Sequence, residues 1–149
     1  MENKPDITAI ILTYDEAIHI RRVIESAFTV ARRVIIVDSF SNDETIAIAT
    51  SMGTEVFQNA FVNQAQQVQW AMDNCNITTA WTMRMDADEY LTPDLISEIH
   101  NRLISIDNTI TGINRGFFKL VGARMFFTGK DPGNNQAFQA TLYAFVFAQ

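Results

Sequence analysis

The sequence predicts an α/β protein with a three-layer α/β/α, Rossmann-like fold around a mostly parallel sheet. Two observations lead to this prediction. Short, continuous runs of apolar and β-branched residues recur along the chain, which is typical of strands covered on both faces. Amphipathic segments separate these runs, and strands that alternate with helices of roughly 10–15 residues form parallel sheets through βαβ crossovers.

The first strand and helix are predicted near the N-terminus. Residues 7–13, ITAIILT, form a continuous apolar run that predicts a buried strand. Apolar residues then recur at helical intervals to about residue 30. Thr13 and Glu16 stand before them at the spacing of a capping box, so we expect them to begin the helix.

The same order of strand and helix is repeated next. Residues 33–37, RVIIV, predict the second strand, and Ser41 with Glu44 forms another capping-box pattern. The helix that follows is expected to end near Gly53, since glycine commonly terminates helices. A third, short strand is predicted for TEVFQ at residues 54–58.

The middle of the chain adds two helices and a strand. Residues 61–74 carry an apolar stripe at helical spacing, and residues 80–86 predict the fourth strand. Thr92 and Pro93 then mark the start of a further helix, because a capping residue followed by proline is favoured at a helix N-terminus.

Length and composition predict one globular domain over residues 1–149, with 48% hydrophobic and 19% charged residues. The formal net charge of −6 provides no basic field for a phosphate backbone, so we expect no nucleic-acid partner. The single cysteine, Cys75, and the absence of a secretory pattern at the start predict a cytoplasmic protein. No apolar run reaches the roughly 18 residues of a membrane span.

The C-terminal segment, residues 117–149, differs from the rest. It holds 8 of the 16 aromatic residues but only 4 of the 28 charged ones, without a clear helical period. Its GKDPGNN stretch predicts a loop. The aromatic residues leave open either a homodimer contact or a peripheral contact with the inner membrane, and composition does not choose between them.

Acidic and polar residues follow three of the predicted strands. Tyr14, Asp15 and Glu16 follow the first strand, Asp38 and Ser39 the second, and Asp86, Ala87 and Asp88 the fourth. Ligands of open parallel sheets bind outside the carboxyl ends of the strands, so these residues are expected to share one rim. Ordinary helix capping or a surface turn is the alternative for any one of them.

The last of these groups, in WTMRMDADEY, predicts a metal site. In an extended segment Asp86 and Asp88 project to the same side, with Arg84 behind them, and two adjacent carboxylates repel unless a cation lies between them. Mg²⁺ or Mn²⁺ typically takes one or two carboxylates and leaves its other positions to phosphates and water. A metal-bridged diphosphate is therefore expected here; a solvated acidic turn that caps the next helix is the alternative.

Together these motifs resemble a known family. TYDEAIHI, VDSFSNDET and MRMDADEYLTPDLI, in this order, are similar to the nucleotide-sugar half of family 2 glycosyltransferases of the GT-A fold. FVNQAQQVQWAMDN is also similar to bacterial lipopolysaccharide core-biosynthesis glucosyltransferases. The resemblance covers residues 7–116 and implies that this region binds a UDP-sugar.

The resemblance also implies roles for individual residues. It places nucleotide-sugar contacts on Thr13, Tyr14, Glu16, Asp38, Arg84, Asp86 and Ala87. Asp38 would accept a hydrogen bond from a base N–H, commonly of uracil, since a carboxylate only accepts. Asp86 would face the ribose and the metal, and Asp88 would ligate the divalent ion. Arg84 would neutralise this cluster or touch phosphate, with a salt bridge to Asp86 as the alternative.

By the same resemblance, the reaction would be an inverting, metal-assisted transfer of a hexose, with glucose expected, to a glycan or lipopolysaccharide-core acceptor. The catalytic base normally lies in an acceptor half, and here Asp131 is the sole acid after Asp107, so the base stays unassigned. We therefore expect a C-terminally incomplete fold. A non-catalytic nucleotide-sugar-binding module and a Mg²⁺-dependent nucleotidyltransferase are the alternatives.

Two further positions carry open alternatives. The family usually has asparagine where Asp15 stands, and an added negative charge beside a diphosphate is unfavourable unless Asp15 points outward as a cap. The glutamines of residues 61–74 form a solvated face, or else Gln64 or Gln67 reaches a sugar hydroxyl.

Overall fold

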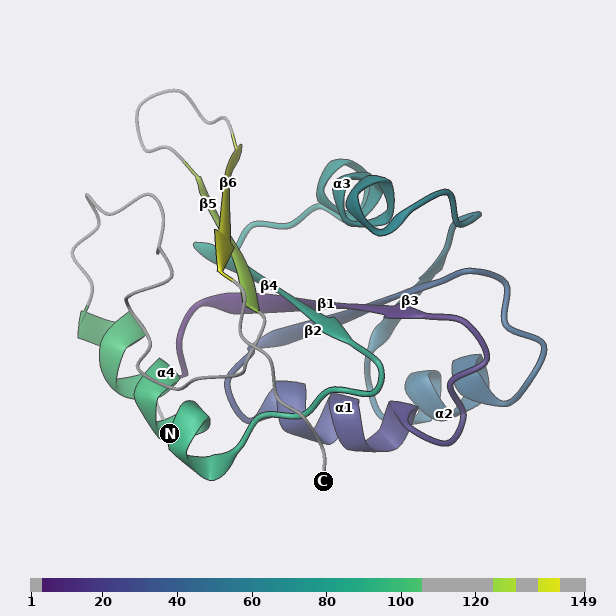
Figure 1. Ribbon diagram of the computed structural model, residues 1–149, viewed down its shortest axis with the longest axis horizontal. Helices are drawn as coiled ribbons and strands as arrows, with labels where there is room; N and C mark the ends of the chain where they lie inside the picture. The colour runs from purple at the N-terminus through teal and green to yellow at the C-terminus, as the bar shows by residue number, and fades with distance from the viewer. Residues whose placement is uncertain (1–3, 106–124, 131–136, 143–149) are drawn as a thin grey trace.

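A computed structural model of the protein describes residues 4–105, 125–130 and 137–142 (Figure 1). Its six-stranded sheet has the order β3-β2-β1-β4-β5-β6. The strands are β1 (Ile7–Thr13), β2 (Arg33–Asp38), β3 (Glu55–Gln58), β4 (Trp81–Asp86), β5 (Met125–Lys130) and β6 (Ala137–Leu142). The first four pair in parallel, which confirms the predicted mostly parallel sheet.

Helices cover both faces of the sheet. They are α1 (Ile20–Phe28), α2 (Thr45–Ser51), α3 (Gln64–Asn74) and α4 (Pro93–Ser105). Figure 1 shows α3 alone above the sheet, with α1, α2 and α4 below it. The predicted three-layer α/β/α arrangement is therefore confirmed. Within the described residues, none of these helices has the length and apolar character needed to cross a bilayer.

The core lies on both sides of the central strands, because successive side chains of a strand point to opposite faces. Ile11 and Ile36 pack toward α1, α2 and α4, whereas Ile10 and Ile35 pack toward α3. These isoleucines are fully buried. This two-sided burial is the reason that the strands read as continuous apolar runs in the sequence.

The strand register brings the predicted rim residues to one edge. Thr13 pairs with Asp38 across β1 and β2, and Leu12 pairs with Asp86 across β1 and β4. Because all three strands are parallel, their carboxyl ends lie side by side. The expectation that these strand ends meet is confirmed.

The two predicted capping boxes are wrong. Thr13 belongs to β1, and its hydroxyl donates to Asp38 rather than to a helix N–H. Ser41 likewise contacts Asp38, while α1 begins at Ile20 and α2 at Thr45. In both cases the hydroxyl that local spacing assigned to a helix end binds the Asp38 carboxylate instead, which is distant in sequence from Thr13 but only three residues from Ser41.

Other predicted helix ends are confirmed. Gly53 follows α2 with a φ of 80°, the left-handed conformation that glycine tolerates. The Thr92 hydroxyl accepts a 3.3 Å hydrogen bond from the Leu95 N–H at the start of α4. The third helix begins at Gln64, later than expected, because the Asn63 side chain caps it by accepting from Gln66 N.

Strands β5 and β6 were not predicted from the sequence. They extend the sheet beyond β4 in antiparallel fashion, with Trp81 opposite Gly129 and Phe126 opposite Thr141. The GKDPGNN stretch begins within β5, and its residues 131–135 lie outside the described residues. Asp131, considered as a base, lies among them.

Candidate functional site

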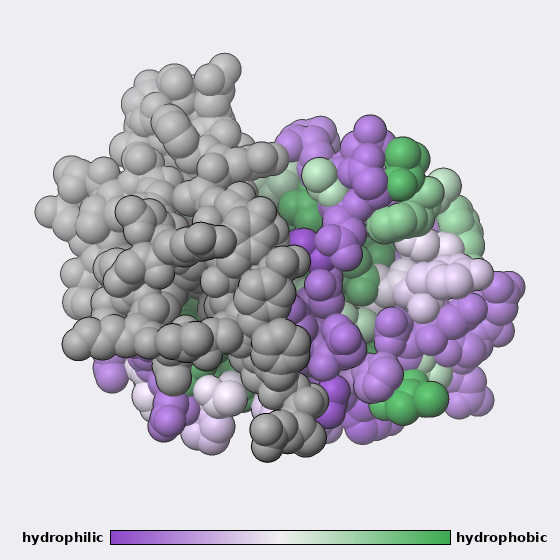
Figure 2. All heavy atoms as spheres, in the orientation of Figure 1, coloured by the Kyte–Doolittle hydropathy of each residue, from purple (hydrophilic) through white to green (hydrophobic). Residues whose placement is uncertain are grey.

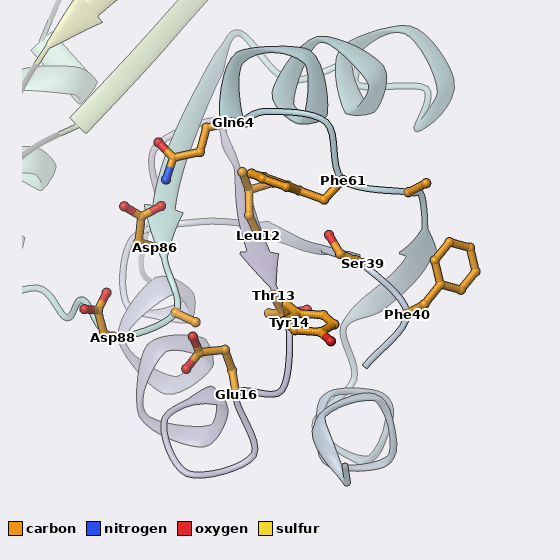
Figure 3. A pocket seen from close by; sticks show the side chains of 12 residues that line it. Leu12, Thr13, Tyr14, Glu16, Ser39, Phe40, Phe61, Gln64, Asp86 and Asp88 are labelled. Carbon is orange, nitrogen blue, oxygen red and sulfur yellow. The ribbon is translucent and has the colours of Figure 1, made fainter. Parts of the chain in front are cut away.

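A pocket of about 740 Å³ opens at the edge of the sheet where β1, β2 and β4 end (Figure 3). Its lining comes from the ends of β1 and β4, from the loops after four strands and from the first residue of α3, and comprises Leu12, Thr13, Tyr14, Glu16, Ser39, Phe40, Ala60, Phe61, Gln64, Asp86, Ala87 and Asp88. Figure 3 shows Glu16, Asp86 and Asp88 on one side, and Tyr14, Ser39 and Phe40 on the other. The pocket therefore has an acidic side and a more apolar side.

Hydrogen bonds from backbone N–H groups to side-chain oxygens join the loops that follow β1 and β2. The Asp15 N–H donates to Ser41 Oγ at 2.8 Å, and Asp15 Oδ1 accepts from the Asn42 N–H at 2.7 Å. The Glu16 N–H donates to Thr45 Oγ1 at 2.8 Å. Tyr14 and Glu16 thus enter the pocket from a loop that is held at several points.

Asp15 itself is not among the lining residues. Its φ of 52° is left-handed, a conformation that aspartate and asparagine adopt more readily than other residues with a Cβ. Its carboxylate points to the neighbouring loop, in agreement with the outward-capping alternative. The added negative charge is therefore used for loop structure.

The apolar side of the pocket exposes aromatic rings. The large hydrophobic residues exposed in the described part of the chain are Tyr14, Ile18, Phe40, Phe61 and Val62. Tyr14, Phe40 and Phe61 line the pocket and are each more than half exposed. On the face seen in Figure 2, the described surface is mainly hydrophilic with hydrophobic residues in small groups. Exposed rings beside a pocket suit a flat ligand, since aromatic faces stack on such groups.

The acidic side is built around the end of β4. The Arg84 guanidinium, which is almost fully buried, forms a salt bridge with Oδ1 of Asp86. Asp88 is exposed, and its backbone carbonyl accepts a 2.9 Å hydrogen bond from Arg22 Nη2. Arg22 also lies 5.1 Å above the Tyr90 ring, a cation–π contact that holds this turn against α1.

Glu89 adds a third carboxyl group beneath this turn. Its Oε2 accepts a 2.9 Å hydrogen bond from the Asp86 N–H. Burial, opposed by this hydrogen bond and reinforced by the charge of Asp86, raises the pKa of Glu89 to about 7. The raised pKa of Glu89 favours its protonated form over that of an ordinary glutamate, which lowers the negative charge packed around Asp86.

The carboxylate oxygens on the acidic side of the pocket are suitable ligands for a hard divalent cation. Within the described ranges, no three histidine, cysteine or carboxylate side chains are grouped to hold a metal ion. Asp86 and Asp88 supply carboxylate oxygens at the pocket, which fits an ion such as Mg²⁺ or Mn²⁺ that completes its shell with ligand phosphates and water. Such an ion would bind weakly without its anionic ligand.

Most residues implied by the resemblance lie in the pocket, namely Thr13, Tyr14, Glu16, Asp86, Ala87 and Asp88. Arg84 and Asp38 do not line it. Arg84 makes the salt bridge that was the alternative for it. Asp38 is fully buried, and its carboxylate accepts from the hydroxyls of Thr13 and Ser41 and from the Ser41 N–H. Its contact with a base stays a prediction.

Sequence reasoning placed Ser39 at the rim without a role and missed other lining residues, among them Phe40 and Phe61. Ser39 and Phe40 directly follow Asp38, and Phe61 lies three residues after the end of β3. Their position after strand ends was a usable signal. The side chains of Phe40 and Phe61 carried none, because phenylalanines are common in ordinary loops and cores.

These features define an α/β protein with a pocket at the carboxyl edge of the parallel part of its sheet. The model of glycosyl transferase family 2 matches residues 8–142, nearly the whole chain. The protein belongs to this family.

Curated relatives agree with this assignment. An uncharacterized glycosyltransferase of Rickettsia bellii is 39% identical over 93 residues, which is 62% of this chain and 31% of the relative. One of Rickettsia felis is 38% identical over 93 residues, covering 62% and 32%. The chain thus spans about a third of the length of these relatives.

Solved structures share the fold. A mannosyltransferase from Pyrobaculum calidifontis, in complex with GDP-Man and Mn²⁺, superposes with a TM-score of 0.56 at 20% identity and covers 76% of this chain and 37% of its own. Glucosyl-3-phosphoglycerate synthase from Mycobacterium tuberculosis, in complex with UDP, gives a TM-score of 0.55 at 17% identity, covering 75% and 45%. The GT-A-like fold is therefore confirmed.

Proposed function

We propose that this chain forms the donor site of a glycosyltransferase that moves a hexose, with glucose expected, from a UDP-sugar to a glycan or lipopolysaccharide-core acceptor. The observation that carries the proposal is a pocket that combines exposed aromatic rings with the Asp86 and Asp88 carboxylates. A nucleoside diphosphate has the same two parts, a flat base and a charged diphosphate.

The two sides of the pocket suggest the orientation of the donor. The base would lie beside Tyr14 and near Ser39, where rings and a hydroxyl are exposed. The diphosphate would lie toward Asp86 and Asp88, with a divalent cation between the like charges. Complexes of fold relatives with GDP-Man and Mn²⁺, and with UDP, support this class of ligand.

A bound Mg²⁺ or Mn²⁺ would neutralise charge that develops on the departing diphosphate. The residues of this chain would prepare the site for it. Arg84 holds the Asp86 carboxylate in place, and Arg22 holds the turn that presents Asp88. No described residue is assigned as the base that takes the proton from the acceptor hydroxyl.

The test is calorimetry of UDP binding to this chain with Mn²⁺ and with excess EDTA. Binding that requires Mn²⁺ supports the proposal, and equal affinity in both conditions contradicts the metal role. A donor-hydrolysis assay with UDP-glucose on the same samples then separates the alternatives. Metal-dependent binding without hydrolysis or transfer would favour the non-catalytic binding module.

A further inference from the structure

Gln67 connects two walls of the pocket without lining it. It lies on α3 with only 1% of its surface exposed. Its Nε2 donates to the Asn59 carbonyl at 2.9 Å and to Ser39 Oγ at 3.1 Å, and its Oε1 accepts from Asn59 Nδ2 at 2.7 Å. The amide thus joins the loop after β2 to the loop after β3.

The orientation of this amide is fixed by a backbone group. The Asn59 carbonyl oxygen can only accept a hydrogen bond, so the atom that faces it must be the Gln67 nitrogen. Exchanging the nitrogen and oxygen would place two oxygens against each other in a buried position. Ser39 Oγ therefore faces an N–H donor and must act as the acceptor in this pair.

This contact excludes one direction for the Ser39 hydroxyl proton. Since Gln67 donates to the oxygen, the O–H cannot point at Gln67 and is available to another acceptor. Ser39 lines the pocket, and in Figure 3 its hydroxyl oxygen points toward the side of Phe61. The apolar side of the pocket consequently presents a hydrogen-bond donor.

We propose that Gln67 is a positioning residue that fixes Ser39 as a donor to a carbonyl oxygen of the bound base, so that the pocket selects a base with a carbonyl over one with an amino group. This inference rests on the proposed function. Uracil and cytosine have the same ring size, but uracil carries a carbonyl where cytosine carries an amino group. An amino group could only donate to the remaining lone pair of Ser39 Oγ, and the Ser39 O–H would then lose the acceptor that a carbonyl offers at this position.

The experiment compares UDP and CDP binding by calorimetry in Mn²⁺ for the wild-type chain and the variants Ser39→Ala and Gln67→Met. Gln67→Met conserves size and removes both donors. We expect the wild type to prefer UDP by on the order of 10-fold and each variant to lose most of this preference. Gln66→Met, an exposed position on the same helix, is the matched control and should keep the wild-type ratio.

A double-mutant cycle in urea denaturation tests the contact without a ligand. Ser39→Ala and Gln67→Met should be non-additive if the two side chains are coupled. If both variants bind UDP and keep the wild-type ratio of UDP affinity to CDP affinity, this inference is wrong while the proposed function stands. No UDP binding by the wild-type chain would overturn the proposed function and the base contact with it, while the cycle would still report on the Ser39–Gln67 pair.

Discussion

The Thr13 hydroxyl donates a 2.8 Å hydrogen bond to Oδ1 of Asp38, which joins the ends of β1 and β2 beneath the pocket. Asp38 also accepts from the Ser41 N–H at 2.8 Å and from the Ser41 hydroxyl. A fully buried carboxylate is tolerated here because donors from both strand ends surround it. Asp38 therefore determines how the loop after β2 leaves the sheet.

Replacing Asp38 should destabilise the protein. Asp38→Ala leaves the Thr13 hydroxyl and the Ser41 N–H without their acceptor, at roughly 1–3 kcal/mol for each buried donor left unsatisfied. Thr13→Val should cost less, because it removes one donor and leaves the Ser41 bonds intact. Urea denaturation measures both. Glu25→Ala, at an exposed position on α1, is the control, and an equal effect there would contradict this role for Asp38.

Phe40 should be strained by its backbone. Its φ of 61° is left-handed, which costs a residue with a Cβ roughly 1–2 kcal/mol. Phe40→Gly and Phe40→Ala both remove the ring, so their difference isolates the backbone. We expect the glycine variant to be more stable than the alanine variant by about 1 kcal/mol in thermal or urea denaturation.

The same pair of substitutions at Phe61 is the control for Phe40. Phe61 is also exposed at the pocket but is not among the described residues with a positive φ. There the alanine variant should equal or exceed the glycine variant in stability. The same order at both positions would show that strain at Phe40 is absent.

Asp88 should matter for metal-dependent binding and little for folding. Asp88→Asn keeps the shape of an exposed side chain but removes its charge. We expect UDP affinity in Mn²⁺ to fall on the order of 10-fold, toward the value in EDTA, with an unchanged melting temperature. Asp94→Asn, an exposed acid in the first turn of α4, should leave the affinity unaltered. Equal losses in both variants would indicate a general charge effect.

Glu89 should make stability depend on pH in the metal-free protein. Burial raises the pKa of Glu89 from 4.5 to about 7, so its stabilising contribution is complete below pH 4.5 and is lost as the pH rises through 7. As the pH rises, the unfolded chain releases this proton near pH 4.5 and the folded chain near pH 7, so the free energy of unfolding falls between these two pH values. Because Glu89 is partly exposed to solvent, we expect the free energy of unfolding to fall by only roughly 1–2 kcal/mol over this range.

Urea denaturation at pH 4.5 and pH 8 in a chelator measures this change. Glu89→Gln should remove the part of the pH dependence that Glu89 contributes, because the amide does not titrate in this range. Glu25→Gln, an exposed carboxyl on α1, should retain the wild-type difference. A pH profile that is identical in the wild type and Glu89→Gln would rule out this titration.

The sequence by itself determined the layered α/β fold and the edge at which the site lies. Strands buried on both faces require apolar side chains at successive positions, so runs such as residues 7–13 and 33–37 are visible without a structure. Parallel strands have their carboxyl ends at one edge, which was enough to place Tyr14, Asp86 and Asp88 together.

The tertiary structure alone decided which partner each polar group uses. The Thr13 and Ser41 hydroxyls fitted local capping patterns but bind Asp38, and Gln67 resembled a solvated helix residue but is buried between two loops. β5 and β6 could not be predicted from the sequence either, because antiparallel pairing at a sheet edge depends on the neighbouring strand β4 more than on the local pattern of residues. The packing of the whole chain decides whether a hydroxyl or amide binds a helix end, a nearby carboxylate (as Ser41 binds Asp38) or a group distant in sequence, so local spacing alone could not reveal these partners.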